Sequence, residues 1–159
     1  QRQMCIRDRC YQLIGVPGSG KSTWVKNQIW ALGLTVVSTD NFVEAYANQQ
    51  GRTYSEVFED YMPTAIDLMI QQVAFAQQHG HTVIWDQTSV TVASRRKKFR
   101  MLPDYKHIAV VFKTPNPEEL SRRLASRPGK IIPGEIVQDM INRFEMPTLE
   151  EGFAEIWHV

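Results

Sequence analysis

Short apolar runs alternate along the chain with longer stretches in which apolar residues recur at helical spacing. The short runs predict strands at residues 11–15, 34–38, 81–86, 107–113 and 153–159, the last of them at a sheet edge. The longer stretches predict helices at residues 21–32, 54–79, 92–102, 117–125 and 135–145. Pro63 is expected to interrupt the second helix, because proline removes a backbone donor and clashes with the preceding turn.

Strands and helices that alternate in this way predict an α/β fold, with a central parallel sheet of about five strands and helices on both faces. Such three-layer sandwiches bind ligands at the carboxyl ends of their strands. No repeat or linker divides the chain, so residues 10–159 are predicted to form one domain. Residues 1–9 fit no element of this pattern and resemble translated adapter sequence, so we exclude them from the fold prediction as a non-native tail.

Composition narrows the class of protein only slightly. The chain has 159 residues, 43% of them hydrophobic and 22% charged, which is typical of a soluble globular domain. The net charge of +1 neither favours nor excludes a nucleic-acid partner. Cys5 and Cys10 form neither a zinc motif nor a disulfide framework, and no apolar run reaches the ~20 residues of a membrane span. We therefore expect a cytoplasmic protein that does not enter a membrane, and its oligomeric state stays open.

The segment GVPGSGKS, residues 15–22, matches the pattern G-x-x-x-x-G-K-[ST] at every fixed position. It follows a predicted strand and opens a predicted helix, which is the context that a phosphate-binding loop requires. Glycines let the backbone curl, so that its N–H groups converge on phosphate oxygens at the positive end of a helix. The alternative is a glycine-rich turn without a ligand, but the full motif in this context favours nucleotide binding.

The motif gives its residues candidate roles in binding ATP and Mg²⁺. Lys21 is expected to reach the β- and γ-phosphates of ATP, and the Ser22 hydroxyl to ligate Mg²⁺. The candidates for nucleotide binding from this segment are Gly15, Pro17, Gly18, Ser19, Gly20, Lys21, Ser22 and Thr23. Kinases, ATPases and GTPases share such a loop. The sequence has no N-K-x-D segment of the kind with which a GTPase reads guanine.

Asp40 lies two residues past the second predicted strand, at the edge of the sheet that faces the loop. Phosphoryl transfer to a hydroxyl benefits from a carboxylate that orients the nucleophile and takes its proton. The alternative is that Asp40 caps a helix beginning at Asn41 or Phe42, and the two roles can coexist. Position favours the catalytic role.

Asp86 ends the third predicted strand at the same edge of the sheet. It is a candidate for holding Mg²⁺ through water or for contacting the acceptor, and Thr88 is a second candidate for the acceptor. The alternative for Asp86 is a turn or cap, with Thr88 and Ser89 beginning the next helix. Spacing does not choose between these roles.

Basic residues gather at two places along the chain. The segment LSRRLASRPGKIIP predicts a lid around residues 122–134, in which Arg127, and with it Arg123, would contact the ATP phosphates. Arg122 fits the surface. The second group is a basic cluster on one predicted helix, made up of Arg95, Arg96, Lys97, Lys98 and Arg100. This cluster could bind a nucleic-acid backbone, although a solvated helix face is favoured.

Four segments together resemble the 5′-kinase domain of bacteriophage polynucleotide kinase and its small relatives, over residues 11–144. They are GVPGSGKSTW, STDNF, IWDQTS and LSRRLASRPGKIIP. The resemblance implies a P-loop kinase-type sandwich that moves the γ-phosphate of ATP to the 5′-hydroxyl end of DNA or RNA, as in nucleic acid repair, and a phage-encoded origin. It implies that Lys21 and Ser22 hold the phosphates and Mg²⁺. Asp40 would be the general base, Asp86 would act at the active centre, and Arg127 would contact the phosphates from the lid.

Two features depart from the family pattern. The segment SVTVASRRKK after the third predicted strand differs from the family in length and charge, and a single position also differs. The family has an arginine three residues after the base, which grips the adjoining phosphate of the acceptor, and Val43 occupies this position here. The grip must then come from elsewhere, and Arg96 in the basic cluster is the first candidate. Two alternative functions stay open: a kinase of a small-molecule hydroxyl such as a nucleoside, sugar or antibiotic, and an ATP-binding switch that transfers no phosphate.

Overall fold

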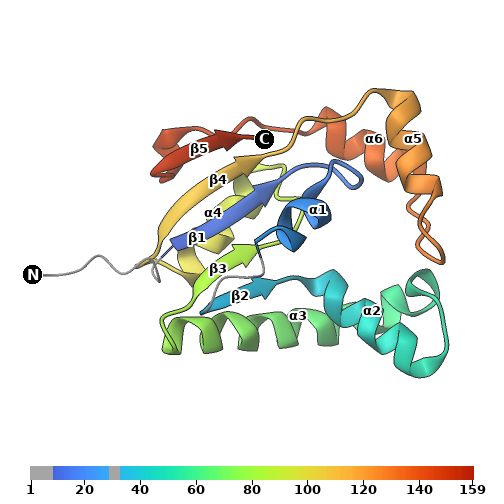
Figure 1. Ribbon diagram of the computed structural model, residues 1–159, viewed down its shortest axis with the longest axis horizontal. Coiled ribbons are helices and arrows are strands. Elements are labelled where there is room, and N and C mark those ends of the chain that lie inside the picture. Colours follow the sequence, from blue (N-terminus) through green and yellow to red (C-terminus); the bar gives the residue numbers. More distant parts are fainter. Residues whose placement is uncertain (1–8, 29–32) are drawn as a thin grey trace, which may run out of the picture.

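The computed structural model describes residues 9–28 and 33–159, which form a parallel sheet flanked by helices (Figure 1). The strands are β1 (Arg9–Ile14), β2 (Leu34–Val37), β3 (Thr82–Trp85), β4 (Lys106–Val111) and β5 (Glu155–His158). Their order across the sheet is β2-β3-β1-β4-β5, and every neighbouring pair is parallel. The α/β prediction is confirmed, as is the placement of the last strand at a sheet edge.

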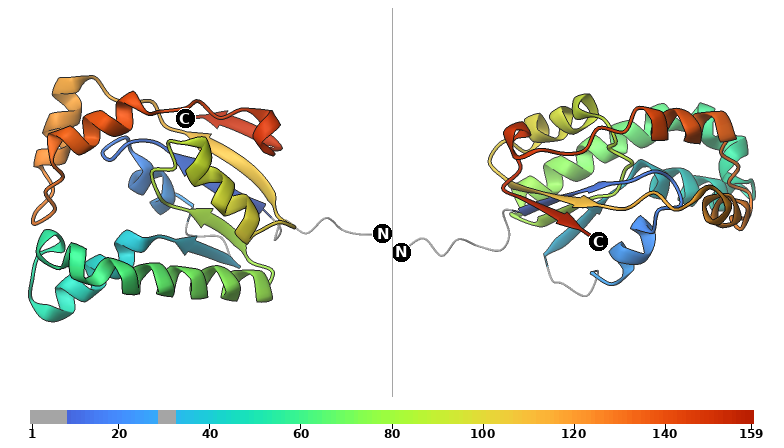
Figure 2. Two further views of the ribbon diagram at one scale, coloured as in Figure 1. Left: turned by 180° about the vertical axis from the view of Figure 1, so that it is seen from behind. Right: turned by 90° about the horizontal axis from the view of Figure 1, so that it is seen from above.

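Six α-helices connect or follow these strands within the described ranges. They are α1 (Lys21–Lys26), α2 (Thr39–Gln50), α3 (Tyr54–Gln78), α4 (Val92–Met101), α5 (Pro117–Ala125) and α6 (Gly134–Asn142). A short 3-10 turn, Leu149–Glu151, precedes β5. Seen along the sheet, α1 lies on one side, and α3 and α4 lie on the other (Figure 2). None of the described helices is long and apolar enough to cross a membrane.

The two faces of the sheet are covered by different residues of the same strands. On one face, Leu13 and Ile84 pack with Val25 of α1. On the other face, Cys10, Val83 and Trp85 pack with Met69 and Val73 of α3 and with Leu102, which follows α4. Successive side chains of a strand point to opposite faces, so strands covered on both sides are apolar at almost every position. This explains why the sequence shows apolar runs instead of alternation.

Helix α3 continues through Pro63, where the sequence predicted an interruption. Pro63 and Glu59 are both exposed, so water can solvate the carbonyl of residue 59, which loses its amide partner to the proline. The helix predicted at residues 21–32 ends at Lys26 in the described part, and residues 29–32 lie outside it. Residues 1–8 of the predicted tail also lie outside the described residues, and Arg9 is the first residue of β1.

Candidate active site

Three connections meet where the central strands end, because β2, β3 and β1 are neighbours and run in the same direction. Together with the segment between α5 and α6, they surround a cavity of about 1260 Å³. The predicted site residues that line it are Pro17, Gly18, Ser19, Gly20, Lys21, Ser22, Thr23, Asp40, Asp86, Thr88, Arg123 and Arg127. The topology therefore brings nearly all of the candidate residues to one place.

The loop between β1 and α1 depends on its glycines for both conformation and space. Gly18 and Gly20 have φ angles of 83° and 105°, which residues with a side chain rarely adopt. A Cβ atom at Gly15 would lie 2.5 Å from Ser19 Oγ and 2.9 Å from Phe112 Cβ. Gly15 lies under the loop and does not line the cavity. The motif thus forms a tight turn whose backbone opens toward the cavity at the start of α1.

Lys21 is the first residue of α1 and lies at the mouth of this loop. Its Nζ donates to the carbonyl oxygens of Gly15 and Val16, at 2.8 and 2.9 Å. Burial lowers the pKa of Lys21 to about 8, an effect that the negative charge of Asp86 opposes. An ammonium group held in this way adds positive charge to a backbone that already presents N–H groups, which is suited to a polyphosphate.

Asp40 lies in the first turn of α2, and its carboxylate is free to face the cavity. The N-cap of α2 is Ser38, whose Oγ accepts the N–H of Asn41 at 3.4 Å. The capping alternative for Asp40 is therefore wrong, because Ser38 is the N-cap, two residues before the position that the sequence suggested. The Asp40 carboxylate accepts hydrogen bonds instead from Tyr54 and from Lys130.

Asp86 directly follows β3, and its backbone N–H donates to the carbonyl of Val37 at 2.8 Å. Its side chain is half-buried, and burial raises the pKa of Asp86 while the ammonium of Lys21 opposes the shift. The carbonyl of Thr88 accepts the N–H of Gly15 at 2.9 Å, which ties this connection to the phosphate-binding loop. The N-cap of α4 is Thr91, so the proposal that the helix begins at Thr88 and Ser89 is wrong.

The fit of Ser22 and Asp86 to Mg²⁺ follows from their chemistry and position. Within residues 9–28 and 33–159, no three His, Cys, Asp or Glu side chains gather as a metal-binding group. At nucleotide sites Mg²⁺ takes only one or two protein oxygens and uses substrate phosphates and water for the rest. The Ser22 hydroxyl at the start of α1 and the half-buried Asp86 carboxylate line the same cavity and match that need, because a cation would stabilise the ionised form of Asp86.

The predicted lid follows α5 and approaches the start of α3 (Figure 1), and its residues Arg127 and Lys130 line the cavity. The backbone N–H of Ser55 donates to Gly129 O at 3.1 Å, and the N–H of Ile131 donates to Ser55 Oγ at 2.9 Å. Gly129 has a φ of 68° and lies so close to Thr53 that a Cβ would approach Thr53 Cβ to 2.9 Å. The segment is therefore docked on α3 at a position where only glycine fits.

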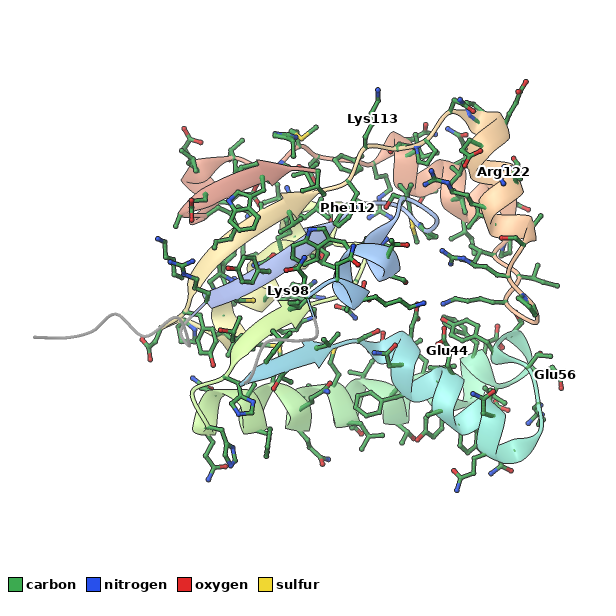
Figure 3. All side chains as sticks on the ribbon, in the orientation of Figure 1. Glu44, Glu56, Lys98, Phe112, Lys113 and Arg122 are labelled. Carbon is green, nitrogen blue, oxygen red and sulfur yellow. The ribbon has the colours of Figure 1, made fainter. Side chains whose placement is uncertain are left out.

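The cations of the lid contact the loop and the Asp40 carboxylate. Arg123 donates from Nη1 to the carbonyl of Gly18 at 3.0 Å. Lys130 Nζ lies 2.9 Å from Asp40 Oδ2 and 3.2 Å from Glu44 Oε1, and Glu44 lies on the side of α2 that faces the lid (Figure 3). Arg122 pairs with Glu119 instead, with its side chain 75% exposed.

The basic cluster on α4 lies away from the cavity, and the predicted solvated face holds for three of its five cations: Arg96, Lys97 and Arg100 are exposed, while Arg95 and Lys98 are buried. Arg95 is fully buried, and its Nε and Nη2 donate to the Glu151 carboxylate at 2.8 and 3.1 Å. Lys98 is also buried, with its Nζ 5.5 Å from the centroid of the Trp85 ring. Arg96 is exposed and lines a separate cavity of about 380 Å³. The suggestion that Arg96 contacts the acceptor is therefore not supported by its position.

Val43 and Tyr54 both belong to the region where α2 packs on α3, but only Tyr54 lines the cavity. Val43 is completely buried between α2 and α3, so its position does not face the cavity. Sequence reasoning did not identify Tyr54, which lines the cavity and donates to Asp40 Oδ1 at 2.7 Å. The threonine before it, Thr53, is a recognisable helix cap, but no local pattern links a tyrosine to a carboxylate 14 residues earlier.

Comparisons with known proteins agree with this arrangement. The chain is 26% identical over 152 residues to a bifunctional polynucleotide phosphatase/kinase of Schizosaccharomyces pombe, a match that covers 92% of this chain and about a third (32%) of that protein. The chain shares its fold with a solved protein from Chloroflexus aurantiacus. The TM-score is 0.70 at 20% identity, and the match covers 96% of this chain and 88% of that one.

Other solved structures with this fold act in different processes. One is a chain of the Pnkp1/Rnl/Hen1 RNA repair complex (TM-score 0.61, 21% identity, 85% of this chain and 43% of that one). Another is a gluconokinase from Sinorhizobium meliloti (TM-score 0.54, 18% identity, 96% of this chain and 82% of that one). The model of the AAA domain family matches residues 11–147. The chain therefore belongs to the AAA domain family and has the fold of P-loop kinases.

Proposed function

We propose that the protein is a polynucleotide 5′-hydroxyl kinase, which transfers the γ-phosphate of ATP to the 5′-OH end of DNA or RNA. The observation that carries the proposal is the position of Asp40 on the same cavity as Lys21 and the docked lid. The match to a polynucleotide phosphatase/kinase over 92% of the chain supports this acceptor over others. The gluconokinase shares the fold alone, so a sugar acceptor has no comparable support.

In this proposal the phosphates of ATP bind to the loop of residues 15–22. Lys21 and Arg127 contact the β- and γ-phosphates, and Arg123 holds the loop by its hydrogen bond to Gly18. Ser22 and Asp86 would hold Mg²⁺, which would supply charge neutralisation at the phosphates. Positioning and charge neutralisation supply most of the rate enhancement in phosphoryl transfer, and the backbone N–H groups of the loop with Lys21 and Arg127 are suited to both.

Asp40 acts as the general base in the transfer. The 5′-oxygen of the acceptor attacks the γ-phosphorus, and the bond from that phosphorus to the β–γ bridging oxygen breaks, so that ADP leaves. The hydroxyl proton passes to the carboxylate of Asp40. Both oxygens of Asp40 already accept one hydrogen bond, from Tyr54 and from Lys130, and each has a second lone pair for the acceptor.

The acceptor's phosphate must be held by cations that line the cavity. Among the described residues these are Lys21, Arg123, Arg127 and Lys130. The wall made by α2 and α3 instead carries carboxylates, at Glu44, Glu56, Glu59 and Asp60. A polyanion would be repelled by that wall and attracted to the lid, so we propose that the acceptor strand leaves the cavity on the lid side.

A transfer assay tests the proposal. Protein, Mg²⁺ and γ-labelled ATP are incubated with a 5′-OH oligonucleotide, and the same oligonucleotide with a 5′-phosphate is the control. Label transfer to the first and not to the second is expected. Absence of transfer at every oligonucleotide length, with transfer to gluconate or a nucleoside instead, would replace the polynucleotide acceptor by a small molecule. ATP binding without any transfer would favour the switch alternative.

A further inference from the structure

Tyr54 has no role in the mechanism above, although it touches the residue on which that mechanism depends. It is the first residue of α3, and its hydroxyl donates to Asp40 Oδ1 at 2.7 Å. Lys130 donates to the other oxygen, Oδ2, at 2.9 Å. The carboxylate is therefore held on both oxygens, by one donor from a helix and one from the lid.

The ring of Tyr54 is anchored by α3 and by the cluster between α2 and α3, and Nζ of Lys130 from the lid also lies 4.3 Å from its centroid. Thr53 caps α3 by accepting the N–H of Glu56 at 3.3 Å, which fixes the backbone of the first turn. The ring packs against the buried cluster between α2 and α3, and its centroid lies 5.5 Å from that of Phe58. The Asp40 side chain, in contrast, is 48% exposed and could adopt several rotamers without a fixed partner.

Tyr54 stays protonated, so its hydroxyl is always available as a hydrogen-bond donor. Burial, and after it the negative charge of Asp40, raise the pKa of Tyr54 well above its usual range. The hydroxyl therefore keeps its proton throughout the pH range of an enzyme assay. It can donate to Asp40 but cannot replace it as a base.

We infer that Tyr54 is a positioning residue, which holds the Asp40 carboxylate in the orientation that accepts the proton of the attacking hydroxyl. The inference rests on the proposed function, because it requires Asp40 to be the general base. A base displaced by about 1 Å can lose about 100-fold in rate, and loss of one of two anchors is a smaller disturbance. The expected signature is a lower kcat with unchanged binding of ATP, whose site Tyr54 does not form.

The test uses Tyr54→Phe, which removes one oxygen and keeps the ring and its packing. We expect kcat to fall about 10-fold, with the KM for ATP and the melting temperature unchanged. Tyr61→Phe is the matched control, because Tyr61 lies on the same helix and its ring stacks on Tyr46 at 4.0 Å. That control is expected to keep the wild-type kcat.

The Asp40→Ala background separates positioning from a merely structural role. With Asp40 absent, Tyr54→Phe should cost nothing further in a single-turnover assay, even if the variant also lowers the melting temperature. A wild-type kcat in Tyr54→Phe, or an equal loss in both backgrounds, would overturn the inference and leave the proposed function intact. Wild-type protein that transfers no phosphate to any hydroxyl would remove the proposed function and this inference together.

Discussion

Lys130 of the lid and Asp40 of α2 form an ion pair of 2.9 Å, although 90 residues separate them in the chain. The lysine side chain is only 14% exposed, and its Nζ also lies 4.3 Å from the centroid of the Tyr54 ring. The lid is therefore tied to the residue that we propose as the base. The segment that docks on the start of α3 is thus the same segment that contacts Asp40.

Replacing Lys130 should weaken acceptor turnover more than ATP binding. Lys130→Met leaves the carboxylates of Asp40 and Glu44 without their shared cation and releases the lid from α2. We expect kcat/KM for a 5′-OH oligonucleotide to fall about 10- to 100-fold, and the Kd of ATP to change less. Arg122→Met is the control, since Arg122 is on the surface of α5. Unchanged acceptor kinetics in Lys130→Met would contradict the role given to this contact.

The charge of Lys21 should appear in the pH dependence of ATP use. Burial lowers the pKa of Lys21 to about 8, and the amine carries its charge only below that value. The kcat/KM for ATP, which reports on the free enzyme, should be level near pH 7 and fall about tenfold per pH unit well above 8. In Lys21→Arg the fall should disappear, because arginine stays charged. A wild-type profile that is level to pH 10 would argue against the lowered pKa of Lys21 or against a need for its charge in ATP use.

The buried pair of Arg95 and Glu151 should contribute to stability and not to the reaction. Arg95→Met leaves a carboxylate that is 9% exposed without its partner, which costs about 3–5 kcal/mol in comparable buried pairs. Urea unfolding should show this loss, and Arg95→Met/Glu151→Gln should recover part of it. Turnover per folded molecule should stay at the wild-type level, since neither residue lines the main cavity. A loss of turnover at full folding would place the pair in the mechanism.

Introducing an arginine at position 43, where the polynucleotide kinase pattern has one, should not create a binding site for the acceptor's phosphate. Val43 is completely buried between α2 and α3, so Val43→Arg places a charge in an apolar cluster. We expect the free energy of unfolding to fall by at least ~2 kcal/mol, with no gain in affinity for the acceptor. Asn41→Arg is the matched variant, because Asn41 is exposed and lines the cavity. A tighter acceptor KM in a stable Val43→Arg protein would show that α2 can turn this position toward the cavity.

The sequence predicted the parts of the site that depend on neighbouring residues. The phosphate-binding loop needs a strand, three glycines and a helix in one segment, so its residues could be named in advance. Asp40 and Asp86 could be placed at one edge because parallel strands end together. The contacts of Asp40 with Tyr54 and Lys130 depend on how α3 and the lid pack across the cavity, which no local pattern determines.

The burial of two residues of the basic cluster could not be predicted either. Five cations within six residues favour a solvated helix face, but α4 turns Arg95 and Lys98 toward the interior. Glu151, which neutralises Arg95, comes from the segment before β5, 56 residues later. Helical spacing alone does not show that a distant carboxylate will pair with Arg95. A buried charge is tolerated only when it has such a partner.

The role of Asp40 as general base is tested most directly by Asp40→Asn in a single-turnover assay with labelled ATP and a 5′-OH oligonucleotide. Asparagine keeps the size and a hydrogen-bond acceptor for Tyr54 but cannot take a proton at neutral pH. We predict an unchanged Kd for ATP and a rate of transfer at least ~100-fold below that of the wild type. Transfer at the wild-type rate by Asp40→Asn would contradict the account.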